Sequence, residues 1–324
     1  MSGYVQRELR KFLNQSNVWT APQTFANGIG QAGTVTPGNV YYVDPTNGTT
    51  GASGKSLDTA VDDLAEAYGK CTSGAGDVIY VISQGTTTAG CTTYLTSALT
   101  WSKHGITVIG VAAPTQYCRA RISTQTDLAK LLSVTGDNNS FYNLHFFQAG
   151  DDAADLGCVE VTGNRNYFEN CHIAGGGHAT PAAETTMYSL KLNGAEEARF
   201  VGCTIGTDTI IRAAANADIM IDGGCARCEF IDCRIESYSE TAGHGAINTV
   251  DAAAITRNLL FKNCVFDVFA MGGVGSCNYL CIGTAPTNGI IMFVDCNKLG
   301  WTSWATGNDA YYTMMGGTTA IVST

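Results

Sequence analysis

The sequence is poor in charge and in proline, and it has no long apolar run. Of its 324 residues, 14% are charged and only 6 are proline. No stretch approaches the 18 or so consecutive apolar residues of a membrane-spanning helix. The first residues carry charges where a secretory signal has its apolar core. We therefore expect a soluble product that is not exported by the Sec route and has no membrane partner.

Basic residues are also few. The chain has 18 Lys and Arg against 28 Asp and Glu, which gives a formal net charge of -10. A nucleic-acid-binding protein needs a basic face to neutralise phosphates, so nucleic acid is excluded as a partner. The sequence does contain 45% apolar residues, enough for a large core, and 38 glycines, which suit many tight corners.

One short pattern recurs six times between residues 141 and 298: Phe-x-(Asn/Gly/Asp)-(Cys/Leu)-x-(Ile/Phe), with the last copy lacking its final apolar residue. The fourth position recurs every 27 to 32 residues, at Leu144, Cys171, Cys203, Cys233, Cys264 and Cys296. This period suits three short strands per turn, whereas a helical solenoid would show apolar residues 3.6 apart. We predict an all-β protein, a right-handed parallel β-helix built as a single-stranded solenoid.

The repeat also predicts a bend. Its Phe and Cys are three residues apart, which in a straight strand would place them on opposite faces. The residue before the Cys is of a type that adopts a left-handed backbone cheaply: Asn143, Asn170, Gly202, Asp232, Asn263 and Asp295. The cysteines would then form an internal column about 4.8 Å apart. Reduced thiols are expected there, with disulfides as the alternative.

Four segments follow from these patterns. Residues 1–40 form an attachment segment, with a short helix whose apolar stripe is Val5, Leu9, Phe12 and Leu13. Residues 41–76 hold an opening loop and a capping helix over 56–68, with Ser56 as N-cap and an apolar side of Leu57, Val61, Leu64 and Tyr68. Residues 77–298 form the β-helix, and the aromatic residues 299–324 form a C-terminal cap or a contact surface.

The opening of the chain resembles a known family. The run Tyr41–Gly48, followed by Gly51 and Gly54 and by residues 76–81, resembles the start of pectate-lyase-like β-helices of phage virion proteins. Residues 18–29 are similar to short β-elements of trimeric phage fibre and decoration proteins. The resemblance implies a homotrimeric virion surface protein, made in the host cytoplasm, that decorates the capsid or forms a head fibre. Residues 1–40 would grip another virion protein.

Host-surface glycan is a further partner that this resemblance allows. The alternative is a tail fibre or tailspike that binds or cleaves host polysaccharide. Carboxylates projecting from adjacent rungs could act as acid and base, but we expect ordinary solvated loop residues and no basic residue beside them. The prediction is therefore a protein that is not an enzyme and has no catalytic residues. The acidic residues considered are Asp151, Asp152, Asp155, Glu184, Asp208, Asp218, Asp222, Glu236, Glu240 and Asp251.

Four cysteines are candidate metal ligands. Cys225 and Cys228 could form a four-thiolate zinc site with Cys277 and Cys281, but the pairs lie almost two rungs apart, so we expect thiols and no metal or cofactor. An exposed Cys91 or Cys118 could cross-link subunits. Among the histidines, we expect His178 and His244 to face solvent from loops, and His145 and His172 to stack outward at a shared repeat position.

Overall fold

The computed structural model describes residues 36–83, 92–113, 115, 120–270, 273–274, 277–305 and 312–315. The chain divides into two compact units, residues 1–37 and 38–324, and the second contains all the described helices and strands. The expected helix around Val5–Leu13, the segment 18–29, Cys91 and Cys118 lie outside the described residues. None of the described helices is long and apolar enough to cross a membrane.

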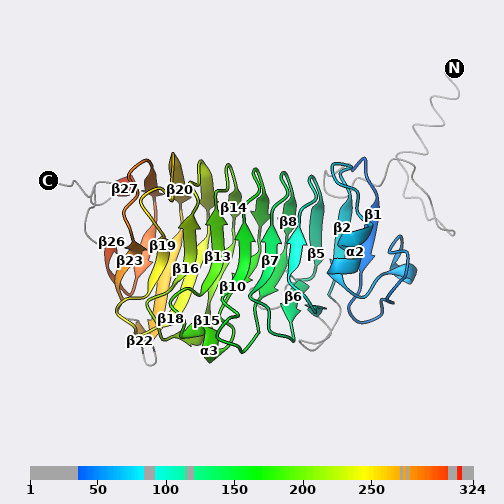
Figure 1. Cartoon of the computed structure of the whole chain (residues 1–324), viewed down its shortest axis with the longest axis horizontal. Helices are drawn as coiled ribbons and strands as arrows, with labels where there is room; N and C mark the ends of the chain where they lie inside the picture. The colour runs from blue at the N-terminus through cyan, green and yellow to red at the C-terminus, as the bar shows by residue number, and fades with distance from the viewer. Residues whose placement is uncertain are drawn as a thin grey trace, which may run out of the picture. The chain divides into compact units, whose positions relative to one another are not determined.

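The second unit is a right-handed parallel β-helix, in which successive rungs follow one another in chain order (Figure 1). Three sheets, named here sheet 1, sheet 2 and sheet 3, are visited once per turn. Within the described residues they contain 10, 9 and 8 strands. Sheet 1 holds β1 (Val40–Val43), β2 (Val78–Ile82), β5 (Thr107–Val111), β8 (Ser140–Tyr142), β11 (Tyr167–Glu169), β14 (Arg199–Val201), β17 (Cys228–Ile231), β20 (Asn258–Lys262), β24 (Ile290–Val294) and β27 (Tyr312–Met315).

The other two sheets complete each rung. Sheet 2 holds β3 (Thr92–Leu95), β6 (Ala120–Thr124), β9 (Leu144–Phe147), β12 (His172–Ala174), β15 (Thr204–Arg212), β18 (Arg234–Ser239), β21 (Val265–Ala270), β22 (Gly273–Val274) and β25 (Asn297–Leu299). Sheet 3 holds β4 (Leu99–Trp101), β7 (Lys130–Val134), β10 (Gly157–Val161), β13 (Tyr188–Asn193), β16 (Ala217–Asp222), β19 (Gly245–Thr249), β23 (Cys277–Gly283) and β26 (Trp301–Ala305).

The repeated phenylalanines form one stack through the core. Neighbouring rings lie 4.5 to 5.5 Å apart between centroids, with ring planes within 19° of parallel. In-register parallel pairing places identical side chains one above another, and offset-stacked rings add to the free energy gained by their burial. The stack comprises Phe141, Phe168, Phe200, Phe230, Phe261 and Phe293.

The predicted bend is confirmed at every repeat. The residues before the cysteine column have φ between 50° and 58°: Asn143, Asn170, Gly202, Asp232, Asn263 and Asp295. Side-chain hydrogen bonds connect some of these corners. Asn170 Nδ2 donates to Asn143 Oδ1 at 3.1 Å, and Asn263 Nδ2 donates to Asp232 Oδ1 at 2.6 Å. Each bend turns the chain from sheet 1 into sheet 2.

The cysteine column is confirmed as a set of free thiols. Each thiol donates to the carbonyl of the phenylalanine in the preceding rung, as Cys233 does to Phe200 O at 3.4 Å. Hydrogen bonding with Cys203 and Cys264, together with burial, raises the pKa of the Cys233 thiol. Of the column members, Cys171, Cys203, Cys233 and Cys264 are buried and Cys296 is half-buried.

The capping helix expected over residues 56–68 is broken in two. A 3-10 turn, η1 (Leu57–Thr59), is followed by α2 (Leu64–Lys70), and between them Val61 pairs with Val43 as a parallel bridge. Asp63 caps α2 by accepting from Glu66 N at 2.6 Å. Leu57 is 60% exposed, so its assignment to the apolar side was wrong. Residues 64–70 still close the core, because the buried Tyr68 ring lies 4.1 Å from that of Trp101.

Candidate functional site

A groove crosses the outer side of sheet 3. Side chains alternate across a strand, and in β13 and β16 the inward set is fully buried: Leu190, Leu192, Ile219 and Ile221. The intervening residues therefore point outward. The register pairs Lys191 with Met220 and Met220 with Asn248, so one outward residue per rung follows the next along the groove.

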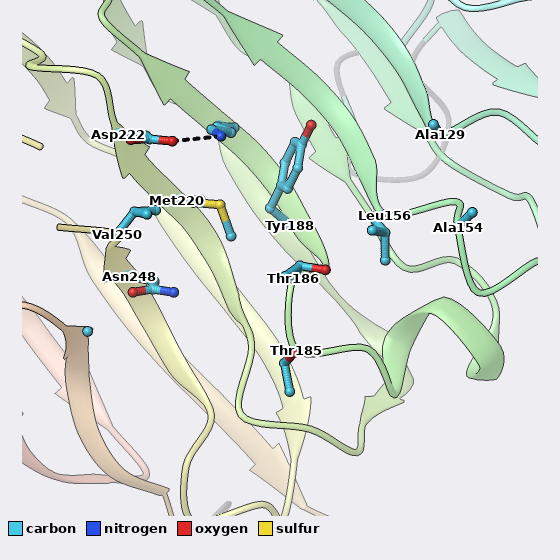
Figure 2. A pocket seen from close by; sticks show the side chains of 12 residues that line it. Ala129, Ala154, Leu156, Thr185, Thr186, Tyr188, Met220, Asp222, Asn248 and Val250 are labelled. Atoms are coloured by element: carbon cyan, nitrogen blue, oxygen red, sulfur yellow. Dashed lines mark ion pairs between the residues drawn. The ribbon is translucent and has the colours of Figure 1, made fainter.

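The groove has a volume of about 610 Å³, within the usual range for small-ligand sites. Figure 2 shows Tyr188, Met220, Asp222 and Asn248 among the side chains that line it. Apolar patches alternate with hydroxyl, amide and charged groups. The full lining is Ala129, Ala154, Leu156, Thr185, Thr186, Tyr188, Lys191, Met220, Asp222, Asn248, Val250 and Gly283.

The charges in and beside the groove are paired. Lys191 Nζ lies 2.9 Å from Asp222 Oδ2, the contact dashed in Figure 2. On the preceding rung, Glu160 accepts from Lys130 Nζ and, at 3.1 Å, from Asn193 Nδ2. Burial alone would raise the pKa of Glu160, but these two donors outweigh burial and lower it. Neither lysine is left to meet a ligand alone.

A glycine makes room for the aromatic residue of the groove. The Tyr188 ring lies over Gly157, where a Cβ would come within 2.4 Å of ring carbon Cζ. Side chains at 157 and 188 are in register on neighbouring strands, so only a residue without a Cβ lets the ring lie flat there. Tyr188 is 8% exposed, and burial raises the pKa of its hydroxyl. The hydroxyl is therefore neutral at ordinary pH.

A second cluster of polar residues lies on sheet 2, where two acidic residues occupy adjacent rungs. Glu236 of β18 pairs in register with Asp267 of β21, which places their Cα atoms about 4.8 Å apart. Arg234 bridges them: Nη1 lies 3.2 Å from Glu236 Oε2, and Nη2 lies 2.8 Å from Asp267 Oδ2. Asp267 Oδ1 has no hydrogen-bond partner among the described residues. We call Glu236 and Asp267 the carboxylate pair.

An irregularity in β15 brings a third acid to this pair. The register with β18 shifts between Thr207 and Ile211, so the intervening residues, with Asp208 among them, are extra relative to β18. Such bulges re-aim side chains, often near active sites. Burial, opposed by Arg234 and reinforced by the charge of Asp208, raises the pKa of Glu236 to about 8. Burial also raises the pKa of Asp267, although Arg234 offsets part of the effect.

Of the carboxylate pair, only Asp267 reaches solvent. The Glu236 side chain is fully buried and that of Asp267 is 8% exposed, while the arginine that covers them is 40% exposed. Two residues further along the strands, Tyr238 and Phe269 pair in register and are both half-buried. The Arg234 guanidinium lies 5.8 Å from the Phe269 ring centroid. An arginine and two aromatic rings therefore frame the exposed edge.

A buried ionic cluster supports the corner between sheets 2 and 3. Asp218 Oδ1 lies 3.1 Å from Arg212 Nη2, and both side chains have no exposed surface. Asp218 also accepts from Ser237 and from Ser189, the latter at 3.2 Å. Burial alone would raise the pKa of Asp218, but the charge of Arg212 and hydrogen bonds from its neighbours outweigh burial and lower it. This cluster holds its corner rigidly and has no access to solvent.

Several residue assignments made from sequence are corrected. His244 does not face solvent: it is fully buried and lies 3.0 Å from Asn216 Oδ1. His145 and His172 do stack, with centroids 4.4 Å apart, but each is only 1% exposed, so they do not point outward to solvent. His178 is exposed as expected.

The cysteine pairs considered for zinc do not converge. Among the described residues, the group close enough to share an ion is Asp62, Asp63 and Glu66. Each of these carboxylates already has a local partner: Asp62 accepts from Thr50 Oγ1 at 2.6 Å, Asp63 caps α2, and Glu66 pairs with Lys70 at 2.9 Å. The four thiols are all buried: Cys225, Cys228, Cys277 and Cys281.

The acidic residues, in contrast, converge more than expected. Asp208 and Glu236 lie together, while Asp222 belongs to the groove. Sequence reasoning missed Asp267 and Arg234. A signal was available, because Glu236 and Asp267 each lie three residues after a cysteine of the column, a position where other rungs have Phe147, Ala174 and Gly206.

No family model matches this sequence, and no curated protein matches it. Solved structures do match in fold. Pectin methylesterase PemA from Erwinia chrysanthemi is 15% identical, with a TM-score of 0.55 over 87% of this chain and 88% of that chain. A rhamnogalacturonan lyase is 13% identical, with a TM-score of 0.55 over 81% of this chain and 68% of that chain. ORF18 of Geobacillus virus E2 is less similar, at 12% identity, a TM-score of 0.46, and 85% and 60% of the two chains.

These matches overturn the expectation that the protein is not an enzyme. The coil is a scaffold shared with enzymes that act on polysaccharides, a similarity of fold at 13–15% identity. Two premises behind that expectation are also wrong. The acidic residues are not all solvated loop residues, since Glu236 is buried in β18 beside Asp267 of β21. A basic residue does lie beside them, namely Arg234.

Proposed function

We propose that this protein binds polysaccharide in the groove on sheet 3 and acts at the surface of a phage virion. The observation that carries the binding proposal is the groove itself, whose lining comes from successive rungs of the coil. Rungs repeat about every 4.8 Å, close to the length of one pyranose residue. A polymer of sugars lying along the coil can therefore present one residue to each rung.

The chemistry of the lining supports the same ligand. Sugar rings have apolar C–H faces and a rim of hydroxyls. Leu156, Met220 and Val250 offer apolar surface for the faces, while the Asn248 amide and the Thr186 hydroxyl can exchange hydrogen bonds with the rim. Such mixed lining favours a neutral polar polymer over a purely apolar ligand.

Filling the groove is expected to abolish this binding. Val250 is 43% exposed and lines the groove, so Val250→Trp adds bulk there without disturbing the core. We expect at least a tenfold loss of affinity, about 1.4 kcal/mol, for purified host capsule or lipopolysaccharide, measured by isothermal titration calorimetry. Val111→Trp is the matched control, because Val111 is 45% exposed on sheet 1, away from the groove. Equal losses in both variants would contradict the assignment.

A second activity, hydrolysis of the glycan, is favoured by the carboxylate pair. Glu236 and Asp267 project from in-register positions on adjacent strands, an arrangement that can bring two carboxyl groups to the roughly 5–5.5 Å separation of retaining glycosidases. Glu236, whose pKa is about 8, would give its proton to the glycosidic oxygen. Asp267 Oδ1, which is buried and has no hydrogen-bond partner among the described residues, would attack the anomeric carbon once Arg234 moves aside. The leaving sugar departs with that proton as its hydroxyl.

The second half of the reaction restores the site. Glu236, now a carboxylate, takes a proton from water, and the resulting hydroxide displaces Asp267 from the anomeric carbon. Arg234 covers Glu236, so the substrate must displace this side chain to reach the acid. Two displacements at one carbon predict retention of anomeric configuration. Reducing ends released from host polysaccharide, with product stereochemistry read by NMR, test the mechanism.

The virion location rests on the resemblance of the first third of the chain to phage proteins. Residues 1–40 would attach the protein, and the coil would assemble as a homotrimer. A truncation starting at Gly38 keeps every described strand from β1 onward, so we expect it to stay soluble and to unfold cooperatively but to be absent from purified particles. Light scattering measures its subunit number. Normal incorporation of the truncated protein into particles would refute the attachment role.

A further inference from the structure

We propose that the groove accepts neutral polysaccharides and rejects polymers of uronic acids. This inference rests on the proposed glycan-binding function and specifies the substrate class of the same groove. It separates this chain from the enzymes that share its fold, which are named for pectin and rhamnogalacturonan, both polymers rich in uronic acid.

The first argument is that the cations of the groove are already occupied. Recognition of a sugar carboxylate is strongest where a cation is free to form a charge-assisted hydrogen bond with it. Lys191, which lines the groove, is held by Asp222 at 2.9 Å and its side chain is only 18% exposed. Lys130, two strands away on β7, donates to Glu160. A uronate would have to compete with a protein carboxylate for either ammonium group.

The second argument is the charge of the surrounding turns. The lining residue Ala154 follows the exposed Asp151 and Asp152, and the lining residue Thr185 follows the half-buried Glu184. Residues 148–157 and 182–190 contain no Lys or Arg. A uronate chain in the groove would bring negative charge toward these acids, which lie one to three residues from lining residues, whereas a neutral chain meets no such repulsion.

The third argument is that hydrogen-bonding capacity remains for uncharged groups. Thr185 and Thr186 are exposed and the Asn248 amide is half-buried, so their donors and acceptors are available to sugar hydroxyls. The neutral hydroxyl of Tyr188 lies on the same surface. The lining residues therefore offer uncharged hydrogen-bonding partners for sugar hydroxyls but no unpaired cation for the carboxylate of a uronic acid.

The test is an array of bacterial capsular and O-antigen polysaccharides that includes neutral and uronate-containing members, probed with the labelled full-length protein. We expect binding to neutral members only. Asp222→Asn, which releases Lys191, should raise affinity for uronate-containing members about fivefold, the scale of one partly exposed ion pair. Asp251→Asn is the control, since it removes the same charge from an exposed turn residue without releasing a lysine.

The outcomes separate this inference from the proposed function. Neutral-only binding, with a gain toward uronates in Asp222→Asn but not in Asp251→Asn, supports it. Preferential binding of uronates by the wild-type protein, or an equal response of the two variants, would overturn the inference and leave glycan binding intact. Binding to no polysaccharide on the array, by the wild type or by either variant, would overturn glycan binding and this inference with it.

Discussion

Cys233→Asp is expected to lower the free energy of unfolding by about 3–5 kcal/mol, the scale for an uncompensated buried charge. Cys233 is 2% exposed and lies between Cys203 and Cys264 in the column, and its thiol donates to the carbonyls of Phe200 and Ile231. None of these groups can neutralise a carboxylate, and the surrounding carbonyl oxygens repel it. Urea titration followed by circular dichroism measures the loss.

The adjacent residue provides a matched control. Asp232 is exposed and has φ of 54°, a conformation that asparagine also adopts cheaply. Asp232→Asn should therefore change the free energy of unfolding by less than about 0.5 kcal/mol. A small effect of Cys233→Asp, or rapid modification of both Cys203 and Cys233 by a thiol reagent in the native protein, would show that the column is not sealed.

Glu236→Gln is expected to lower the rate of glycan hydrolysis by about 10²–10⁴-fold, because glutamine cannot donate the proton that the leaving oxygen needs. Wild-type activity requires the protonated acid, so it should fall as pH rises through about 8, the pKa of Glu236. The exposed Glu240 at the end of the same strand supplies the control variant, Glu240→Gln. Unchanged hydrolysis in Glu236→Gln would remove Glu236 from the mechanism.

The same substitution, Glu236→Gln, is also expected to change how the free energy of unfolding depends on pH. The folded-state pKa of Glu236 is raised from 4.5 to about 8, so its protonated form is favoured by folding. That contribution is fully present below pH 4.5 and is lost as pH rises toward 8. Glu236→Gln keeps an uncharged side chain at all pH values, and we expect its free energy of unfolding to exceed that of the wild type at pH 9. This stability measurement needs no polysaccharide, so it does not depend on which substrate is correct.

The fold could be predicted from sequence because the repeat encodes it locally. A phenylalanine, a left-handed residue and a small thiol recur in order, and each requirement is met within four residues of chain. The break in the helix over 56–68 could not be predicted in this way. It depends on Val61 pairing with Val43, a contact made only once the coil has closed. Local propensity is overridden there by tertiary pairing.

The two functional surfaces were harder to foresee. Glu236 and Asp267 are 31 positions apart in the chain and become neighbours only through the register of β18 and β21. His244 looked solvated because glycines flank it, yet its loop folds over the buried Asp218. The sequence gives the types of these residues, but their burial and partners depend on corner loops whose paths have no periodic signal.

Two corners of each rung differ in how much sequence change they can accept. In the rungs from β8 to β19 the connection between sheets 1 and 2 is one or two residues, whereas the connection between sheets 2 and 3 ranges from 4 residues (213–216) to 13 (175–187). The short corner between sheets 1 and 2 leaves little room for insertions. The long corner between sheets 2 and 3 borders both the groove and the carboxylate pair. A lineage adapting to a new host glycan could therefore exchange this one series of loops, rung by rung, while inheriting the coil unchanged.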